Sequence, residues 1–219
     1  MEQQIRERVA SLLLKIGAVT FRFDPPYTYT SGIKSPIYLD NRLVMSYPEV
    51  RSEIIELYAQ MIKEKIGMEN VEWISATATA AIPQGALVAD RLKIPMVFVR
   101  PSSKGHGKQA KMEGYMEKGK KVVIIEDHIS TAGSVLNNAE TIRELGGIVD
   151  YCVSTSTYET QASIDTLAAN KITLIAMTTG KTILKMAEEE KYLTPEQKQD
   201  VEAWFADPQH WGDKFNSNT

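Results

Sequence analysis

The sequence has little cysteine: Cys152 is the only one among 219 residues. A single thiol cannot form an internal disulfide, and it falls within a predicted strand, so we interpret it as a buried structural residue of a reduced, cytoplasmic protein. Long apolar runs are missing, and the N-terminus carries charges of both signs, so we expect neither a signal peptide nor a membrane span. The net charge is only −3, which predicts neither a nucleic-acid nor a membrane partner.

Two common phosphate-binding motifs are also absent. The sequence has no G-x-G-x-x-G, the fingerprint of dinucleotide-binding folds, and no Gly-Lys-Ser/Thr follows the small-residue turn at residues 130–134, so that turn is not a P-loop. It has three histidines, and none belongs to a His/Cys cluster with metal-ligand spacing. We therefore expect any metal to be a Mg²⁺ ion held mainly by a substrate and water, with no firm protein ligand.

What the chain does have is a regular alternation of strands and helices from Val71 to about residue 190. Strands are predicted at 71–75, 95–99, 122–125, 148–154 and 172–176, and helices at 83–92, 135–145, 164–168 and 179–190. Repeated βα units predict a mostly parallel α/β sheet with helices on both faces. The length suits one domain over residues 1–219, with a helix and short strands at about 1–45 and a C-terminal helix and tail at about 191–219. Trp204 and Trp211, near the end, fit either surface packing or an interface.

The stretch from Lys121 to Ser134 (KVVIIEDHISTAGS) is the one around which the chain is organised. An apolar β-branched run is followed by Glu126 and Asp127, where a parallel strand would deliver them to a ligand crevice. A turn of small residues, 130–134, then leads into a helix, so backbone N–H groups and the positive end of the helix dipole suit a phosphate. Two carboxylates beside a phosphate site indicate a phosphorylated sugar, with the acids on its hydroxyls or on a metal.

The segment from Arg100 to Lys120 is long for a connection within a compact domain. Its first part, residues 100–111, carries four cations and no acidic residue: Arg100, Lys104, Lys108 and Lys111. His106 stands between two glycines that let the segment close over a ligand and open again. Because this basic loop follows a strand of the same sheet, it suits a second, leaving phosphate group. A sugar phosphate with a leaving pyrophosphate is phosphoribosyl pyrophosphate (PRPP).

Four segments, in order, resemble the orotate phosphoribosyltransferases of the type I phosphoribosyltransferase class. They are 30–42 (TSGIKSPIYLDNR), 77–90 (TATAAIPQGALVAD), 98–107 (FVRPSSKGHG) and 125–134 (IEDHISTAGS). The resemblance runs from about residue 10 to 190. It implies the type I phosphoribosyltransferase fold with an N-terminal hood. It also implies Mg²⁺, and transfer of the phosphoribosyl group from PRPP to orotate in pyrimidine biosynthesis, giving orotidine 5′-monophosphate and pyrophosphate.

The same resemblance assigns roles to individual residues and implies a homodimer in which the basic loop 100–111 reaches the neighbouring subunit's site. The residues implied in PRPP binding are Arg100, Lys104, His106, Glu126, Asp127, Ser130, Thr131, Ala132, Gly133 and Ser134. Of these, the implied catalytic residues are Lys104, His106, Glu126 and Asp127. The residues implied beside orotate are Lys34, Tyr38, Leu39 and Ser130.

Some positions depart from those of other family members. Thr30, Ala80 and Pro101 stand where lysines occur in some of them, and Tyr158 stands near the place of an arginine for the orotate carboxylate. Lys34 or backbone N–H groups are then the candidates to neutralise that carboxylate. Two other functions are considered: a purine-type phosphoribosyltransferase, which the hood motif disfavours, and a PRPP-sensing regulator that binds nucleic acid, for which the chain shows no basic module.

Overall fold

The computed structural model of the protein describes residues 2–29, 31–101 and 111–215. The helices are α1 (Glu2–Lys15), α2 (Pro48–Met61), α3 (Ile82–Leu92), α4 (Gly133–Glu144), α5 (Gln161–Ala169), α6 (Gly180–Glu189) and α7 (Pro195–Ala206). The strands are β1 (Val19–Phe21), β2 (Tyr27–Thr28), β3 (Lys34–Ser35), β4 (Ile37–Leu39), β5 (Trp73–Thr77), β6 (Met96–Val99), β7 (Met112–Glu113), β8 (Lys121–Ile129), β9 (Ile148–Thr157) and β10 (Thr173–Thr179). Two 3₁₀ segments also matter below, η1 (Asn41–Ser46) and η5 (Trp211–Phe215).

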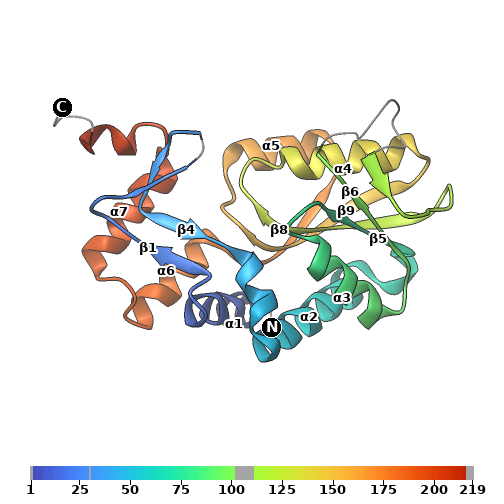
Figure 1. Ribbon diagram of the computed structural model, residues 1–219, viewed down its shortest axis with the longest axis horizontal. Helices are drawn as coiled ribbons and strands as arrows, with labels where there is room; N and C mark the ends of the chain where they lie inside the picture. Colours follow the sequence, from blue (N-terminus) through green and yellow to red (C-terminus); the bar gives the residue numbers. More distant parts are fainter. Residues whose placement is uncertain (1, 30, 102–110, 216–219) are drawn as a thin grey trace.

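The centre of the molecule is a six-stranded sheet in the order β10-β9-β8-β5-β6-β7. Every neighbouring pair is parallel except β6 and β7. Helices α4 and α5 cover one face, and α1, α2 and α3 cover the other (Figure 1). The predicted α/β class, its parallel sheet and its two helical layers are therefore confirmed. The helices are needed on both faces because the strands of a parallel sheet are buried on both sides.

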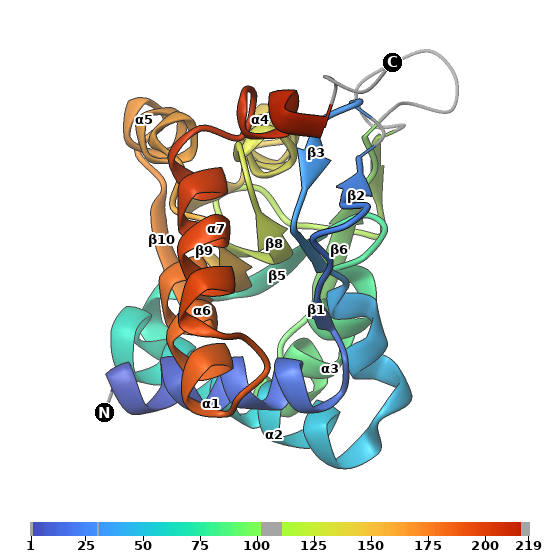
Figure 2. The ribbon, with the colours of Figure 1, turned by 90° about the vertical axis from the view of Figure 1, so that its left-hand side faces the viewer.

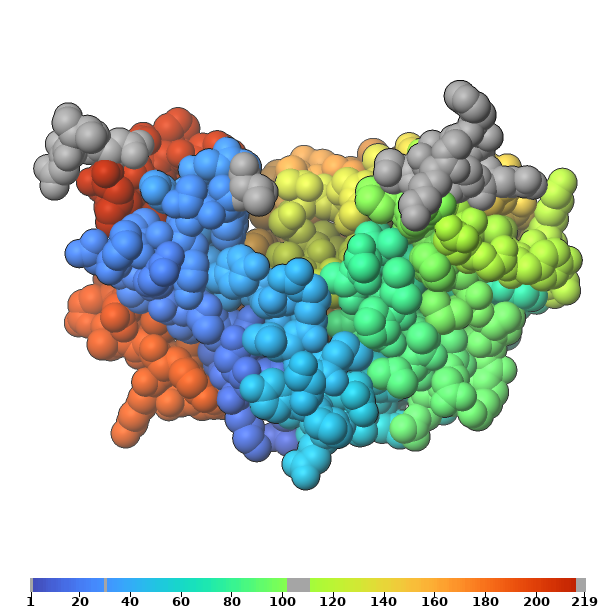
Figure 3. Space-filling view, viewed as in Figure 1, coloured from blue at the N-terminus to red at the C-terminus, as the bar shows by residue number. Residues whose placement is uncertain are grey.

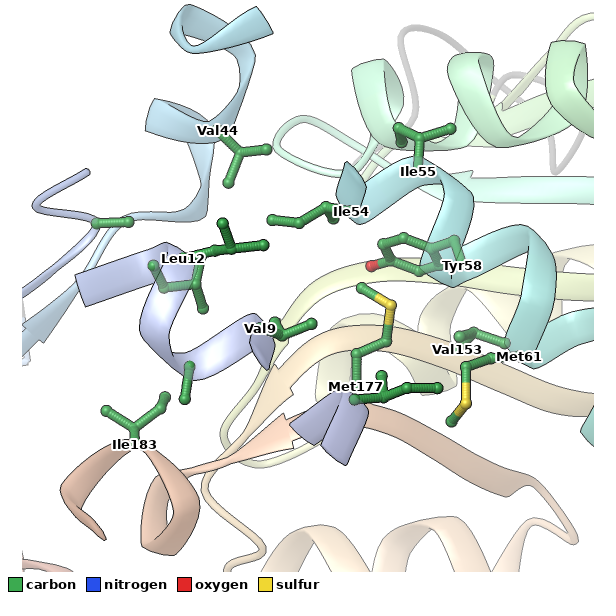
Figure 4. Packing of buried hydrophobic residues seen from close by; sticks show 14 of the residues in the cluster. Val9, Leu12, Val44, Ile54, Ile55, Tyr58, Met61, Val153, Met177 and Ile183 are labelled. Carbon is green, nitrogen blue, oxygen red and sulfur yellow. The ribbon is translucent and has the colours of Figure 1, made fainter. Parts of the chain in front are cut away.

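The core between the sheet and α1–α2 shows why the predicted helices form. Apolar side chains recur at helical spacing on α1 and α2 and meet Val153 and Met177 of the sheet (Figure 4). Helix α2 begins with Pro48 at its first position, where the missing N–H costs no hydrogen bond. Helix α7 begins with a capping box, in which Thr194 and Gln197 satisfy each other's backbone N–H groups.

The long connection after Arg100 is partly built into the sheet. The two-residue strand β7 pairs antiparallel with β6, with Val99 opposite Met112. Next to this pair, the Arg100 N–H donates to the carbonyl of Lys111 at 2.9 Å. The basic loop thus leaves the sheet and returns to it at one place. Lys104, His106 and Lys108 lie outside the described residues.

A smaller unit stands beside the sheet, and we call it the hood: β1 to β4 together with α7 and η5. Strand β1 pairs with β4, and β2 pairs with β3. Figure 2 shows α7 and η5, from the C-terminal end, lying alongside these N-terminal strands. Trp204 and Trp211 are 4% and 8% exposed, so within this chain both tryptophans pack internally.

Candidate active site

The two acidic residues lie within β8, because this strand is longer than the sequence indicates. The strand was expected to end at Ile125, but it continues to Ile129. Pairing with β9 carries it on, with Glu126 opposite Ser154 and His128 opposite Ser156. The acids still lie toward the carboxyl end of the parallel strands, where crevices form in open α/β sheets. Figure 3 shows the surface hollowed between the hood and the rest of the molecule.

Of the two acidic residues, Glu126 is the one whose side chain lies inside the protein. It is 3% exposed. One carboxylate oxygen accepts a hydrogen bond from the Ser134 hydroxyl at 2.8 Å, and the other accepts one from the Asp127 N–H at 3.1 Å. Both oxygens of Glu126 are therefore engaged by protein donors, one of which belongs to the turn before α4. Asp127 is only half-buried and is the carboxylate of the pair that faces outward.

Burial changes the charge of this pair. Removal from water, followed by the nearby Asp127 charge, raises the pKa of Glu126 to about 8. Burial also raises the pKa of Asp127 above its usual value. Since two adjacent carboxylates that are largely removed from water do not both ionise readily, we assign the negative charge of the pair at neutral pH to Asp127, the more exposed of the two. A lower charge reduces the repulsion that a phosphorylated substrate would meet.

We predict that Glu126 makes the free protein less stable as the pH rises. Its folded pKa, about 8, lies above its ordinary value of 4.5. The folded state therefore holds a proton that the unfolded state releases, and stability falls between these two pH values. Replacing Glu126 by Gln removes this titration, so Glu126→Gln should gain stability relative to the unsubstituted protein between pH 5.5 and pH 8.5.

Urea unfolding at the two pH values measures this difference. Glu140→Gln, at an exposed position on α4, is the matched control and should follow the unsubstituted protein. A Glu126→Gln protein whose stability changed with pH just as much as that of the control would contradict the prediction.

The small-residue turn at 130–134 joins β8 to α4. Ala132 precedes α4 with φ 65° and ψ 8°, a left-handed conformation that a small unbranched residue tolerates. The turn sets the first N–H groups of α4, and its positive dipole end, beside the acidic pair. A Cβ on Gly133 would come no closer than 4.0 Å to the nearest protein atom, the Thr131 hydroxyl. The turn therefore leaves room for a ligand against its backbone, as predicted for a phosphate.

Arg100 stands at the base of the basic loop. Its guanidinium lies 2.8 Å from a carboxylate oxygen of Glu113, on β7. Its carbonyl accepts a hydrogen bond from Asn137 of α4 at 3.4 Å. The structure therefore brings Arg100 near α4, which starts at the small-residue turn, and pairs its guanidinium with an acid. Lys104 and His106, which are predicted to act together with Arg100, lie outside the described residues.

The three predicted hood residues lie on β3 and β4. Lys34 donates from its ammonium to the Thr28 hydroxyl at 2.9 Å, across the β2–β3 pair. Tyr38 is 39% exposed and its ring centroid lies 5.5 Å from that of Tyr27. Leu39 follows on β4 and is half-buried. Strands β3 and β4 thus place the Lys34 ammonium close to a partly exposed aromatic ring.

Two residues that sequence reasoning did not single out join the hood and α2 to the acidic strand. Asn41, 1% exposed, donates to the carbonyl of Asp127 at 2.6 Å and to the Ser156 hydroxyl at 3.0 Å. Tyr58, fully buried, donates to the carbonyl of Glu126 at 2.9 Å. Asn41 was visible only as the end of the Thr30–Arg42 motif, and the Tyr58 hydroxyl had no signal beyond its place on the inner face of a helix.

His128 also belongs to this network. Its Nδ1 lies 2.9 Å from the Ser156 hydroxyl, and its ring packs edge-on against Tyr158 at 4.3 Å between centroids. Burial lowers the pKa of His128 to about 4, so the ring is neutral at neutral pH. Tyr158 also packs against Trp204 and Phe205 of the hood. These contacts link β8 to the hood.

Two structural searches bear on metals and membranes. Within residues 2–29, 31–101 and 111–215, no group of three or more His, Cys, Asp or Glu side chains is placed to hold a metal ion. In the same ranges, no helix is long and apolar enough to cross a membrane.

Comparison with known proteins decides the family. The model of the phosphoribosyl transferase domain matches residues 46–175. A protein of Coxiella burnetii named orotate phosphoribosyltransferase is 42% identical over 203 residues, which cover 93% of this chain and 96% of that protein. One of Enterococcus faecalis with the same name is 43% identical and covers 95% of this chain and 99% of its own. The chain belongs to the orotate phosphoribosyltransferase family.

Solved structures agree with this membership. The orotate phosphoribosyltransferase of Aeropyrum pernix superimposes with a TM-score of 0.73 at 27% identity, covering 84% of this chain and 99% of that one. The Leishmania donovani UMP synthase superimposes with a TM-score of 0.75 at 24% identity, and the match spans 42% of that longer chain. An adenine phosphoribosyltransferase of Thermoanaerobacter pseudethanolicus reaches 0.56 at 21% identity, and this likeness shows only that the fold is shared with the purine-type enzymes.

Proposed function

We propose that this protein transfers the 5-phosphoribosyl group from PRPP to orotate and releases orotidine 5′-monophosphate and pyrophosphate, a step of pyrimidine biosynthesis. The observation that carries the proposal is near full-length identity above 40% to proteins named orotate phosphoribosyltransferase. The acidic pair, the phosphate turn and the hood support it, since they supply the three kinds of group that PRPP and orotate require. A cytoplasmic location stays a prediction.

The ribose phosphate is assigned to β8 and the turn that follows it. The 5′-phosphate would lie against residues 130–134, where Gly133 leaves open space and the start of α4 supplies N–H donors. Asp127 would hold the ribose hydroxyls, because it is the outward-facing carboxylate. Glu126 would hold the turn through Ser134. Positive charge that develops on the ribose ring as the bond to pyrophosphate breaks would then meet the Asp127 carboxylate.

Mg²⁺ fits this donor set as a substrate-borne ion. Asp127 has an outward-facing carboxylate, whereas both oxygens of Glu126 are engaged by protein donors. Asp127 would therefore hold the ion, directly or through water, and PRPP oxygens would supply most of the other ligands. Bound in this way, the ion neutralises charge on the pyrophosphate.

The leaving pyrophosphate is assigned to Arg100, Lys104 and His106. Cations that meet the negative charge as it grows on the leaving group lower the barrier rather than only tighten binding. Arg100 would exchange its Glu113 partner for a phosphate oxygen. Orotate is already an anion, so attack by its N1 needs positioning more than a strong base. Closing the loop would exclude the water that otherwise hydrolyses PRPP.

Orotate is assigned to the hood, next to Lys34, Tyr38 and Leu39, with Ser130 below it. Tyr158 lies where some family members place a cation for the orotate carboxylate. A phenol carries no positive charge, so Tyr158 cannot replace that cation, and burial, which raises its pKa well above the usual value, keeps it from becoming an anion. Lys34, or backbone N–H groups, would then neutralise the carboxylate.

One assay tests the function. Purified protein, Mg²⁺, PRPP and orotate are mixed, and orotate loss is followed by absorbance, with adenine and hypoxanthine as alternative acceptors. The expected result is consumption of orotate with release of pyrophosphate. Turnover of a purine without turnover of orotate would replace this function with the purine-type activity. A band shift with RNA at physiological salt would point to the regulator instead.

We also propose that two copies of this chain form a homodimer that shares the basic loop. Leu43, Tyr47 and Leu87 are large apolar residues that are 37%, 43% and 37% exposed. They lie in η1, just before α2, and in α3, segments that pack together and lie side by side on the face shown in Figure 3. A second copy would cover these apolar side chains, and the fold would then present each loop to the neighbouring site.

Leu87→Asp is expected to shift the protein from dimer to monomer, because a carboxylate buried in such an interface has no partner. Light scattering after gel filtration measures the mass, and Ile148→Asp, another exposed apolar position, is the control that should stay dimeric.

Sharing of the loop is tested by mixing Lys104→Ala and Asp127→Asn subunits. A mixed dimer has one site without either change, so activity should return on mixing. No recovery in subunits shown to exchange would contradict a shared loop.

A further inference from the structure

The C-terminal part of the hood holds the strand that carries Lys34. Helix α7 runs alongside the hood strands, and η5 packs on β3 (Figure 2). The four motifs that carry the resemblance lie between residues 30 and 134, so none of them connects this segment with the site. The contacts of Trp204 and Gly212 show what the segment does.

Trp204 fixes the backbone of Lys34. Its indole Nε1–H donates to the carbonyl of Lys34 at 2.9 Å. The indole is 4% exposed and packs nearly perpendicular to the rings of Tyr29 and Tyr158, with centroid distances of 6.1 Å and 5.8 Å. Because the indole is packed in this way, its hydrogen bond restrains the position of the Lys34 carbonyl.

Two further contacts fix the side chain of Lys34. A Cβ added to Gly212 of η5 would lie 2.7 Å from the Lys34 Cβ and 2.9 Å from its Cγ, so the backbone of η5 lies directly on the aliphatic stem. The ammonium donates to the Thr28 hydroxyl at 2.9 Å. This hydrogen bond uses one of its three N–H groups, which leaves donors for an anion.

We propose that Trp204 is a positioning residue for the orotate subsite: through the Lys34 carbonyl it sets where the Lys34 ammonium meets the orotate carboxylate. The inference rests on the proposed function, in which Lys34 lies beside orotate. A carboxylate in a partly buried site needs a cation at a fixed distance, because a displaced ammonium loses both the hydrogen bond and the charge interaction. Trp204 touches neither substrate in this arrangement and acts through Lys34 alone.

Trp204→Phe tests the proposal, since it keeps an aromatic ring and removes the N–H donor together with part of the indole. We expect the KM for orotate to rise roughly three- to tenfold, the effect of one lost hydrogen bond. The KM for PRPP and kcat at saturating orotate should stay close to those of the unsubstituted enzyme. Trp73→Phe is the matched control, because its indole also donates to a backbone carbonyl, that of Tyr115 at 3.2 Å, and it lies on β5 rather than in the hood. It should leave the KM for orotate unchanged.

A double substitution separates positioning from general destabilisation. Lys34→Met keeps the aliphatic stem under Gly212 and removes the ammonium. If Trp204 acts through that ammonium, Trp204→Phe should add nothing to the orotate KM in the Lys34→Met background. Full additivity, an equal rise in the PRPP KM, or an unchanged orotate KM in Trp204→Phe would each overturn the inference. Absence of orotate turnover by the unsubstituted protein would instead refute the proposed function.

Discussion

Asp127→Asn is expected to lower kcat by roughly 10²–10³-fold, the usual cost of losing one group that stabilises charge in a transition state. Asn has the same shape, and the hydrogen bond from Asn41 reaches the backbone carbonyl of residue 127 rather than its side chain. The fold and the strand should therefore be kept. What is lost is the negative charge beside the ribose ring, which we assign to Asp127 because both oxygens of Glu126 accept hydrogen bonds from the protein.

Initial rates at saturating PRPP, orotate and Mg²⁺ measure this effect, and thermal unfolding verifies that the variant is folded. Asp150→Asn is the matched control, since Asp150 is exposed on β9 near its other end, and it should retain full activity. A folded Asp127→Asn enzyme with kcat within a few-fold of the unsubstituted one would show that the charge lies elsewhere, with Glu126 as the next candidate.

Ala132→Val is expected to lower kcat/KM for PRPP by about 10²-fold, because the turn that faces the phosphate must move. Ala132 has φ 65°, where a β-branched side chain is strongly disfavoured, and it is 3% exposed, so the added methyl groups have no free space. A displacement of the phosphate site by about 1 Å is enough for a loss of this size.

Ala132→Gly is the companion variant for that experiment. Glycine adopts the left-handed conformation without strain, so this enzyme should keep its KM for PRPP close to the original value. Binding of PRPP with Mg²⁺ by calorimetry, together with steady-state rates, measures both variants. Equal losses in the Val and Gly variants would show that the Ala132 methyl itself, and not the turn geometry, is what PRPP requires.

The parts of the fold that follow from apolar periodicity were predictable from the sequence. The five strands from β5 to β10 apart from β7, and the helices α3 to α6, lie within a few residues of their predicted positions. The end of β8 was wrong because Glu, Asp and His have little strand propensity, and the pairing with β9 that carries the strand to Ile129 is a non-local effect. Strand β7 has two residues, too few for any period to appear.

The site divides in the same way. Small residues in a strict order predicted the turn before α4, and its left-handed residue and open space are present, while phosphate binding by this turn stays a prediction. The division of roles between Glu126 and Asp127 was not predictable, because it depends on which carboxylate meets Ser134 and on burial. The contacts of Asn41 and Trp204 were missed for a similar reason. Asn41 donates to the carbonyl of Asp127 and Trp204 to the carbonyl of Lys34, and every residue has a backbone carbonyl, so the sequence does not show which one is used.

Because β6 and β7 pair with each other, the residues of the basic loop between them can be exchanged or removed without breaking the sheet. Since Arg100 and Lys111 are already joined by a hydrogen bond, the two strands satisfy the geometry of a hairpin whatever connects them. Replacing the intervening residues by a short turn would close that hairpin with less loss of chain entropy than the natural loop requires. The sheet, the acidic pair and the phosphate turn would be untouched. Chimeras that exchange this segment between relatives, or omit it, can therefore separate the affinity for PRPP from the rate of its reaction.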